Sequence, residues 1–134
     1  MKGFLFDGRE QSVVFIETIQ IPTGEECDVY KFENDPSKDL GIIRMKPGGK
    51  TPLQKILKGD RTIEGYVSGR GRLTITGTDG KRVVYKVDEE TGKSFSVWVE
   101  IGECMQWEAD KDSELVAYEI CLPPYEDGRY ENIG

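Results

Sequence analysis

The chain has 134 residues, of which 37% are hydrophobic and 32% charged, and its formal net charge is −7. This length fits one domain with a hydrophobic core. The sequence contains no histidine, which excludes Ser-His-Asp and Cys-His nucleophiles, His-containing zinc sites and imidazole as an acid or base near neutral pH. The negative charge disfavours nonspecific binding to a nucleic-acid backbone, so we expect no nucleic-acid partner.

The cysteines and the first residues indicate the cellular compartment. The three cysteines, Cys27, Cys104 and Cys121, are an odd set without the spacing of metal ligands. Charged residues interrupt the opening segment MKGFLFD too early for the apolar stretch of a signal peptide. No apolar run approaches the ~20 residues that cross a bilayer. We therefore expect a cytoplasmic protein with reduced thiols and no membrane partner.

Short β-forming runs fill the chain from Val13 onward, and no window has a helical apolar period. Residues typical of turns separate these runs. The strongest hairpin signal is Asp79-Gly80, because a two-residue turn needs positive φ at both centres. The first dozen residues and the segment after Pro124 are expected to be accessory arms. The sequence predicts ten strands, over Val13–Ile21, Asp28–Phe32, Leu40–Met45, Thr51–Leu57, Thr62–Ser68, Gly71–Thr76, Arg82–Val87, Phe95–Ile101, Met105–Ala109 and Glu114–Leu122.

A segment in the middle of the chain resembles the first motif of the cupin family, G-x5-H-x-H-x3-4-E-x6-G. Gly48 is followed after five residues by Gln54 and then, after one more, by Ile56. Glu64 precedes Gly71 with six residues between them. The loop from Ile56 to Glu64 is three or four residues longer than the pattern, and both histidine positions hold other residues.

The second cupin motif, G-x5-P-x-G-x2-H-x3-N, is also similar to a segment of this chain. Ser94, Glu100 and Gly102 take the Gly, Pro and Gly positions, Met105 takes the His and Ala109 the Asn. The resemblance implies an all-β fold, a cupin-like double-stranded β-helix or jelly-roll barrel. It further implies a single domain over residues 1–134, with the core barrel at about 40–125, N-terminal strands 13–32 packed on it and a short C-terminal tail, 126–134.

The resemblance also bears on metal binding, because the cupin ion usually sits on three His and one Glu. One carboxylate, one amide and one thioether suit neither a hard nor a borderline ion. We therefore expect no metal and no cofactor. A shifted alignment leaves open whether the longer loop rebuilds a different site, with Lys58 and Asp60, or Leu57 and Gly59, at the histidine positions. In the first alignment the four ligand positions hold Gln54, Ile56, Glu64 and Met105.

The catalytic candidates are Glu64 and Tyr66. Alternation along residues 62–68 puts them on one face, which the resemblance places inside the barrel. An apolar interior would raise the pKa of Glu64, so that it could serve as a general acid or base. The alternative is a buried Glu64 paired with a Lys or Arg. The candidate ligand-binding residues are Gln54, Met105, Trp107 and Tyr118 inside the barrel, several of which core packing would also explain, and Lys50, Lys55 and Arg72 near its entrance.

Charge is unevenly distributed along the chain. From Arg44 to Arg72 there are eight basic residues and two acidic ones, a balance of +6, and the remainder carries −13. In the resembling fold this segment frames the barrel mouth, where a basic rim would attract a carboxylate- or phosphate-bearing ligand. The alternative is a solvated strand face whose charge the acidic remainder balances.

Three functions are compatible with these features. The leading hypothesis is a cytoplasmic, homodimeric barrel that binds a small metabolite without a metal, and a basic rim at the mouth would favour an anionic one. The second is a metal-independent enzyme of the sugar isomerase or epimerase kind that uses Glu64 or Tyr66. The third is a non-catalytic structural or regulatory barrel that dimerises and whose interior is filled by side chains.

Overall fold

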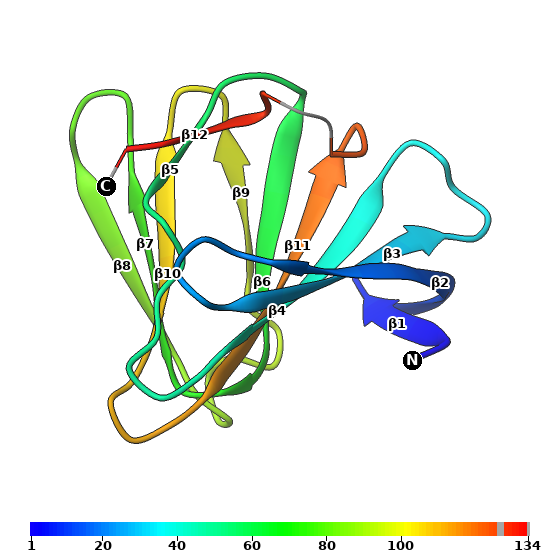
Figure 1. Ribbon diagram of the computed structural model, residues 1–134, viewed down its shortest axis with the longest axis horizontal. Coiled ribbons are helices and arrows are strands. Elements are labelled where there is room, and N and C mark those ends of the chain that lie inside the picture. Colours follow the sequence, from blue (N-terminus) through cyan, green and yellow to red (C-terminus); the bar gives the residue numbers. More distant parts are fainter. Residues whose placement is uncertain (126–127, 134) are drawn as a thin grey trace.

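The computed structural model describes residues 1–125 and 128–133, which form antiparallel strands (Figure 1). No helix among the described residues has the length and apolar character that a membrane crossing requires. Each of the ten predicted strands corresponds to a strand of the structure, and the two further ones, β1 and β12, lie in the expected arms. The strands are β1 Gly3–Phe6, β2 Arg9–Gln20, β3 Glu26–Phe32, β4 Asp39–Met45, β5 Gln54–Ile56, β6 Arg61–Gly69, β7 Gly71–Thr76, β8 Arg82–Val87, β9 Ser96–Glu100, β10 Cys104–Ala109, β11 Leu115–Leu122 and β12 Tyr130–Asn132.

Two sheets face each other and enclose the barrel interior (Figure 1). The larger sheet has the order β1-β2-β3-β4-β11-β6-β9, and the smaller has the order β12-β5-β10-β7-β8. Strands that are far apart in the sequence therefore become neighbours: β11 pairs with β4 on one side and with β6 on the other. The all-β barrel architecture expected from the sequence is confirmed.

Side chains alternate between the two faces of each sheet, which produces two apolar clusters. The first lies between the sheets and includes Met105, Trp107, Leu73 and Tyr66. The second lies on the outer face of the larger sheet, where the β1–β2 hairpin packs with Phe4 against Tyr118. The chain thus has an inner core and a separate outer core.

The tight turns differ from the expectation. Asp7 and Gly8 both have positive φ, 53° and 75°, and they join Phe6 to Arg9, which pair directly. Asp7-Gly8 thus forms the kind of two-residue turn that was predicted for Asp79-Gly80. There, β7 and β8 do pair as expected, but the loop between them runs from residue 77 to residue 81. Of Asp79 and Gly80, only Gly80 has positive φ. The two-residue turn at Asp79-Gly80 was therefore a wrong prediction.

A bulge in β2 determines which of its side chains face the interior. Phe15 pairs with Tyr30, but Glu17 pairs with Val29, so the register shifts by one residue between them. Such a shift turns the following side chains to the opposite face of the sheet. Phe15 accordingly contacts the Tyr30 ring on the outer face, whereas Glu17 and Ile19 line the cavity described next.

Candidate functional site

A cavity of about 530 Å³ opens between the two sheets at the mouth of the barrel. Strands β2, β3, β4 and β11 form one wall, and β5, β12 and Tyr125 form the other. Gly41 on β4 helps to keep the space open, because a Cβ atom there would lie 2.9 Å from the Cys27 sulfur. The size is that of a site for a small organic molecule.

The cavity wall is acidic. Glu17, Asp39 and Glu119 contribute carboxyl groups, and no Lys or Arg belongs to the described residues that line it. Burial, followed by the charge of Glu119, raises the pKa of Asp39, although a hydrogen bond from the Tyr125 main-chain N–H at 2.9 Å opposes the shift. Such a wall repels anions and favours neutral or cationic molecules.

Glu119 is one of the carboxyl groups that line the cavity, and it accepts two side-chain hydrogen bonds. The Tyr130 hydroxyl donates to its Oε1 atom, and the Cys121 thiol donates to the same atom at 3.4 Å. Tyr130 and Cys121 also contact each other, at 3.3 Å. Tyr130 reaches this position because β12 pairs with β5 and closes the smaller sheet over the mouth.

Glu64 lies directly behind Glu119. The two residues are cross-strand partners on β6 and β11, and Glu64 is fully buried. Its Oε1 atom accepts a hydrogen bond from the Trp107 indole N–H at 2.8 Å. Burial, then the charge of Glu119 and a hydrogen bond with it, raises the pKa of Glu64 well above the ordinary value, outweighing Trp107 and Arg129. Burial in this place therefore favours the neutral form of the Glu64 carboxyl group over the charged form.

The two cysteines of the cavity wall are held as thiols. Burial, with smaller contributions from Glu119 and other acids, raises the pKa of Cys27 to about 12. Burial likewise raises the pKa of Cys121 well above its ordinary value. A thiolate is the nucleophilic form of cysteine, so neither residue suits nucleophilic catalysis.

Arg129 fixes the segment that leads into β12. Its side chain is fully buried, and it donates to the main-chain carbonyls of Arg61, Pro123 and Leu122 at 2.7, 3.0 and 3.3 Å. It lies directly over Gly59, where a Cβ atom would come within 2.3 Å of the guanidinium. Within the expected C-terminal tail, Arg129 is thus anchored inside the molecule, and the next residue is Tyr130.

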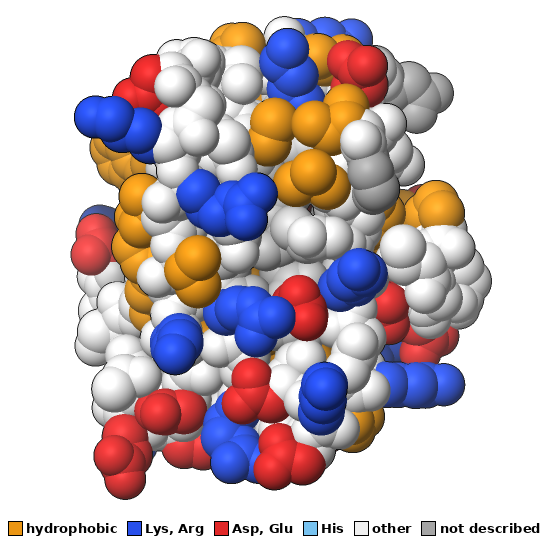
Figure 2. All heavy atoms as spheres, turned by 90° about the vertical axis from the view of Figure 1, so that its left-hand side faces the viewer, with side chains coloured by type: hydrophobic (Ala, Val, Ile, Leu, Met, Phe, Trp, Pro, Cys, Tyr) orange, Lys and Arg blue, Asp and Glu red, His pale blue; other side chains and the backbone are white. Residues whose placement is uncertain are grey.

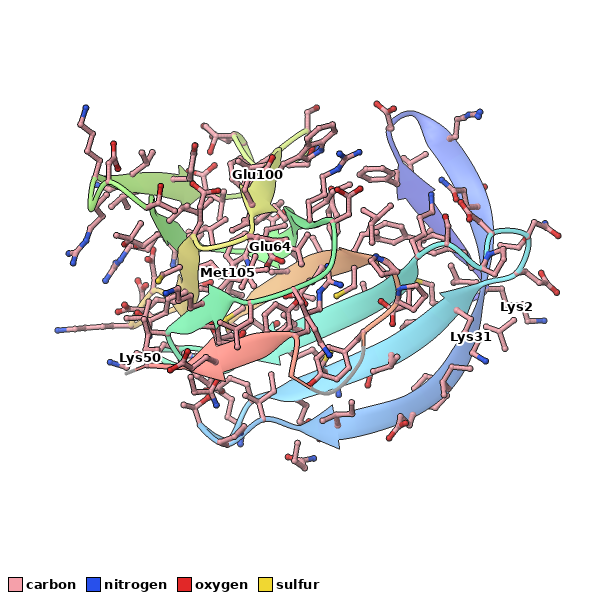
Figure 3. The ribbon with its side chains drawn as sticks, turned by 90° about the horizontal axis from the view of Figure 1, so that it is seen from above. Lys2, Lys31, Lys50, Glu64, Glu100 and Met105 are labelled. Carbon is pink, nitrogen blue, oxygen red and sulfur yellow. The ribbon has the colours of Figure 1, made fainter. Side chains whose placement is uncertain are left out.

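Of the residues expected to bind the ligand, Gln54 lines the cavity, and its side-chain amide donates to Asn132 at 3.2 Å. Met105 and Trp107 face the interior but are 3% and 2% exposed, in the packed part of the inner core. Tyr66 also belongs to that core, and its hydroxyl donates to the Gly69 carbonyl at 2.8 Å. Figure 3 shows Glu64 and Met105 between the two sheets.

Tyr118 lies on the opposite face of the larger sheet from Glu64, contrary to the expectation that it lines the barrel interior. It belongs to the outer core, where its ring lies 5.0 Å from that of Phe4. It also covers Gly65, where a Cβ atom would clash with the ring at 2.0 Å. The expectation failed because Tyr118 is next to Glu119 in a strand, and neighbouring residues point to opposite faces.

The three basic residues expected at the entrance lie elsewhere. Arg72 forms an ion pair with Glu108 at 2.8 Å, and Lys50 bridges to Glu108 through the main chain. Lys55 is exposed and pairs with Cys104 on the outer face of the smaller sheet. Basic and acidic side chains intermingle on that side of the molecule (Figure 2), and Lys50 lies at the periphery (Figure 3). The positions of Lys50, Lys55 and Arg72 agree with the alternative of a solvated strand face.

Sequence reasoning missed Glu119 and Tyr130. A signal for Glu119 was present, because it alternates with Ala117 and Cys121 along an apolar strand and so had to share their inner face. Tyr130 carried no such signal, since it follows two prolines in a segment without strand periodicity.

Comparisons with known proteins give the architecture a name. No protein-family model and no curated protein matches the sequence. Among solved structures, a cupin-2 domain protein from Rhodospirillum rubrum superposes with a TM-score of 0.66 at 16% identity, over 98% of this chain and 79% of that one. The chain has the cupin fold.

Two further cupin-fold neighbours have names that indicate an activity or a ligand. Bacillus subtilis oxalate decarboxylase matches with a TM-score of 0.67 at 18% identity, over 88% of this chain and 30% of its own length. The Streptomyces protein PAC13, as a variant with uridine, matches with a TM-score of 0.61 at 14% identity, over 88% and 84%. At these identities the comparisons establish the fold alone.

The side chains at the cupin ligand positions do not fit a metal ion. Bacillus subtilis oxalate decarboxylase has Mn(II) centres, but here Ile56 and Met105 present hydrocarbon and a thioether, and both are buried. The Glu64 carboxyl group accepts a hydrogen bond from Trp107, and Glu64 pairs across the strands with Glu119. Among the described residues, no group of three or more His, Cys, Asp or Glu is arranged to hold a metal. The donor set lacks the several oxygens or imidazoles that Mn(II) prefers.

Proposed function

We propose that this chain binds a small, polar, neutral or cationic molecule in its mouth cavity, without a metal. The observation that carries the proposal is the cavity of about 530 Å³ whose described lining includes Glu17, Asp39 and Glu119 but no basic residue. The cavity argues against a barrel filled by its own side chains. Its charge argues against the anionic ligand that the basic segment suggested, because Arg72 and Lys50 lie on the outer face of the smaller sheet.

The test is a comparison of ligands that share a five-carbon chain but differ in charge. We expect the neutral polyol xylitol or the diamine cadaverine to raise the thermal midpoint of unfolding, and the dicarboxylate glutarate to leave it unchanged, because bound ligand stabilises the folded state. Uridine is a further neutral ligand for this comparison, since the structural neighbour PAC13 was solved with it. Preferential stabilisation by glutarate would overturn the proposal.

Three variants test whether the ligand binds in the cavity. Val29→Phe fills space on the inner face of β3 and should abolish the shift, whereas Val83→Phe changes an exposed valine on β8 and should leave it intact. Glu17→Gln removes one lining carboxylate and should weaken cadaverine more than xylitol. Binding that Val29→Phe does not change would place the ligand elsewhere.

A second candidate function is acid–base catalysis on the bound molecule, as in the isomerase hypothesis. Glu64 does not line the cavity and the Tyr66 hydroxyl is engaged by Gly69, so such chemistry would fall to a carboxyl group of the lining. Among these, Glu119 is the one that Tyr130 and Cys121 hold in place by hydrogen bonds. The homodimer, the cytoplasmic location and the lack of a nucleic-acid partner remain predictions, which sedimentation, cell fractionation and nucleic-acid binding assays would test.

A further inference from the structure

The carboxyl group at the family's metal-ligand position is used differently in this chain. Glu64 Oε2 is buried and receives no hydrogen bond from a donor in the described part of the chain. Directly across the sheet from Glu64 lies Glu119, whose Oε1 atom already accepts from Tyr130 and Cys121. Two ionised carboxylates in these places would repel each other and leave a buried oxygen without a partner, which is costly.

A proton on Glu64 resolves both problems. Protonated Glu64 donates to the Glu119 carboxylate while its other oxygen still accepts from Trp107 at 2.8 Å. The result is a chain of hydrogen bonds from the inner core to the cavity surface, through Trp107, Glu64 and Glu119. Since Glu119 lines the cavity and Glu64 does not, the outer carboxylate meets the ligand and the inner carboxyl holds the proton.

We propose that Glu64 and Glu119 share one proton in place of the metal and act as an acid–base pair, through which Glu119 exchanges protons with a neutral or cationic ligand. The exchange with the ligand depends on the binding proposed above, but the shared proton does not. Glu119 contacts the ligand, whereas Glu64 is a positioning residue that acts through Glu119.

The other titratable and charged groups around the pair leave it in need of that proton. The one cation among them, Arg129, donates to three main-chain carbonyls, and none of these three bonds goes to either carboxyl group. Cys27 and Cys121 are protonated, as described above, and burial also raises the pKa of Tyr130 well above its ordinary value. The groups in question are Cys27 on β3, Asp39 on β4, Cys121 on β11, and Arg129 and Tyr130 at β12.

The pair permits a balanced proton transfer without a further reactant. A proton of the ligand moves to Glu119 Oε as the N–H, O–H or C–H bond breaks, and the electron pair of that bond stays on the ligand. Return of the proton to another atom of the same ligand completes an isomerisation and restores the singly protonated pair. No oxidant, reductant or metal enters this step.

Infrared spectroscopy tests the shared proton without any ligand. The purified protein near neutral pH should show the carbonyl stretch of a protonated carboxylic acid, which shifts in deuterium oxide. Glu64→Gln should remove this band, because the Gln side chain donates an N–H to Glu119 in its place. Glu131→Gln, an exposed change on β12, is the control that should retain it. Absence of the band in the wild type, or its survival in Glu64→Gln, would overturn the proposal.

Chemical labelling tests whether Glu119 presents the pair to the cavity. The cationic carbodiimide EDC adds to a carboxyl group with uptake of a proton, which the proton shared with Glu64 supplies at Glu119, so mass spectrometry should locate the adduct on Glu119 near neutral pH. Glu64→Gln should strongly reduce labelling at Glu119, because the shared proton is gone, and leave the labelling of exposed carboxyls unchanged. Unlabelled wild-type Glu119, or equal labelling in both proteins, would contradict the acid–base role.

These results separate the pair from the proposed function. A protonated-carboxyl band and Glu119 labelling with no stabilisation by xylitol, cadaverine or uridine would refute ligand binding and keep the pair. Stabilisation by one of these molecules without the band would keep binding and refute the pair.

Discussion

The two halves of the barrel interior differ in how tightly they are packed. In the closed half, between β6, β7 and β10, Leu73 and Trp107 are almost completely buried. In the mouth half, between β2, β4, β5 and β12, a cavity remains and carboxyl groups line it. The side chains at the cupin motif positions fall mostly in the closed half, and the residues that face the cavity come mostly from outside the motifs. In this chain the side chains at the motif positions are thus mostly packed, and the open space lies beside them.

The largest difference between the halves should appear on truncation of apolar side chains. Leu73→Ala removes a fully buried side chain and should lower the free energy of unfolding by about 2–5 kcal/mol. Ile19→Ala, at the mouth and 41% exposed, should cost about 1 kcal/mol or less. Denaturant unfolding of both variants measures the contrast, and equal losses would show that the mouth is packed like the closed half.

A hydroxyl removed from each half gives the next largest contrast. Tyr130→Phe deletes the hydroxyl that donates to the Glu119 carboxyl group, leaves that oxygen without this partner, and should cost roughly 1–3 kcal/mol. Tyr66→Phe deletes a bond to the neutral Gly69 carbonyl and should cost about 0.5–1.5 kcal/mol. Denaturant unfolding near neutral pH compares them. A smaller loss for Tyr130→Phe would show that the Tyr130–Glu119 hydrogen bond does not help to hold the mouth half together.

The pH dependence of stability should separate the buried acid from the rest of the molecule. Because the pKa of Glu64 is raised in the fold, its stabilising contribution is complete below the unfolded value of about 4.3 and is lost as pH rises toward the folded pKa. Glu64→Gln should remove this pH-dependent loss. Above the folded pKa, its free energy of unfolding should therefore rise relative to wild type by about 1.4 kcal/mol for each pKa unit of the shift. Thermal unfolding from acid to mildly alkaline pH measures it, and parallel curves would refute the raised pKa.

The smallest effect is expected on the outer face of the smaller sheet. The Arg72–Glu108 ion pair is partly exposed, with side chains 41% and 35% accessible, so Arg72→Gln should cost about 0–1 kcal/mol. It should also leave the ligand-induced thermal shifts unchanged, because Arg72 lies outside the cavity. Loss of binding in Arg72→Gln would restore the basic-rim hypothesis.

The sequence was informative about the fold for physical reasons that also limit it at the site. Strand alternation and turn residues are local, so they predicted ten strands, and Asp7-Gly8 carried a turn signal that would have revealed β1 as well. The inner face of Glu64 followed from the same alternation. The β2 bulge that turns Glu17 inward depends on how β2 pairs with β3, and no pattern within the β2 sequence predicts it.

The remaining site residues depend on contacts distant in sequence. Tyr130 reaches Glu119 because Arg129 binds carbonyls near Pro123 and at Arg61, a contact with no periodic signature. The basic segment was misleading because charge counts along a chain do not show which face of a sheet carries the side chains. Lys50 and Arg72 share the outer face near Glu108, away from the mouth they were expected to frame.

The most direct test of this account is the thermal midpoint of the wild type and of Glu64→Gln with and without added Mn(II). A carboxyl pair that holds a proton instead of a metal predicts that Mn(II) leaves both midpoints unchanged, because an ion that does not bind the folded state cannot stabilise it. A rise in the wild-type midpoint that Glu64→Gln abolishes would contradict the account, since it would show that Glu64 still serves as a metal ligand.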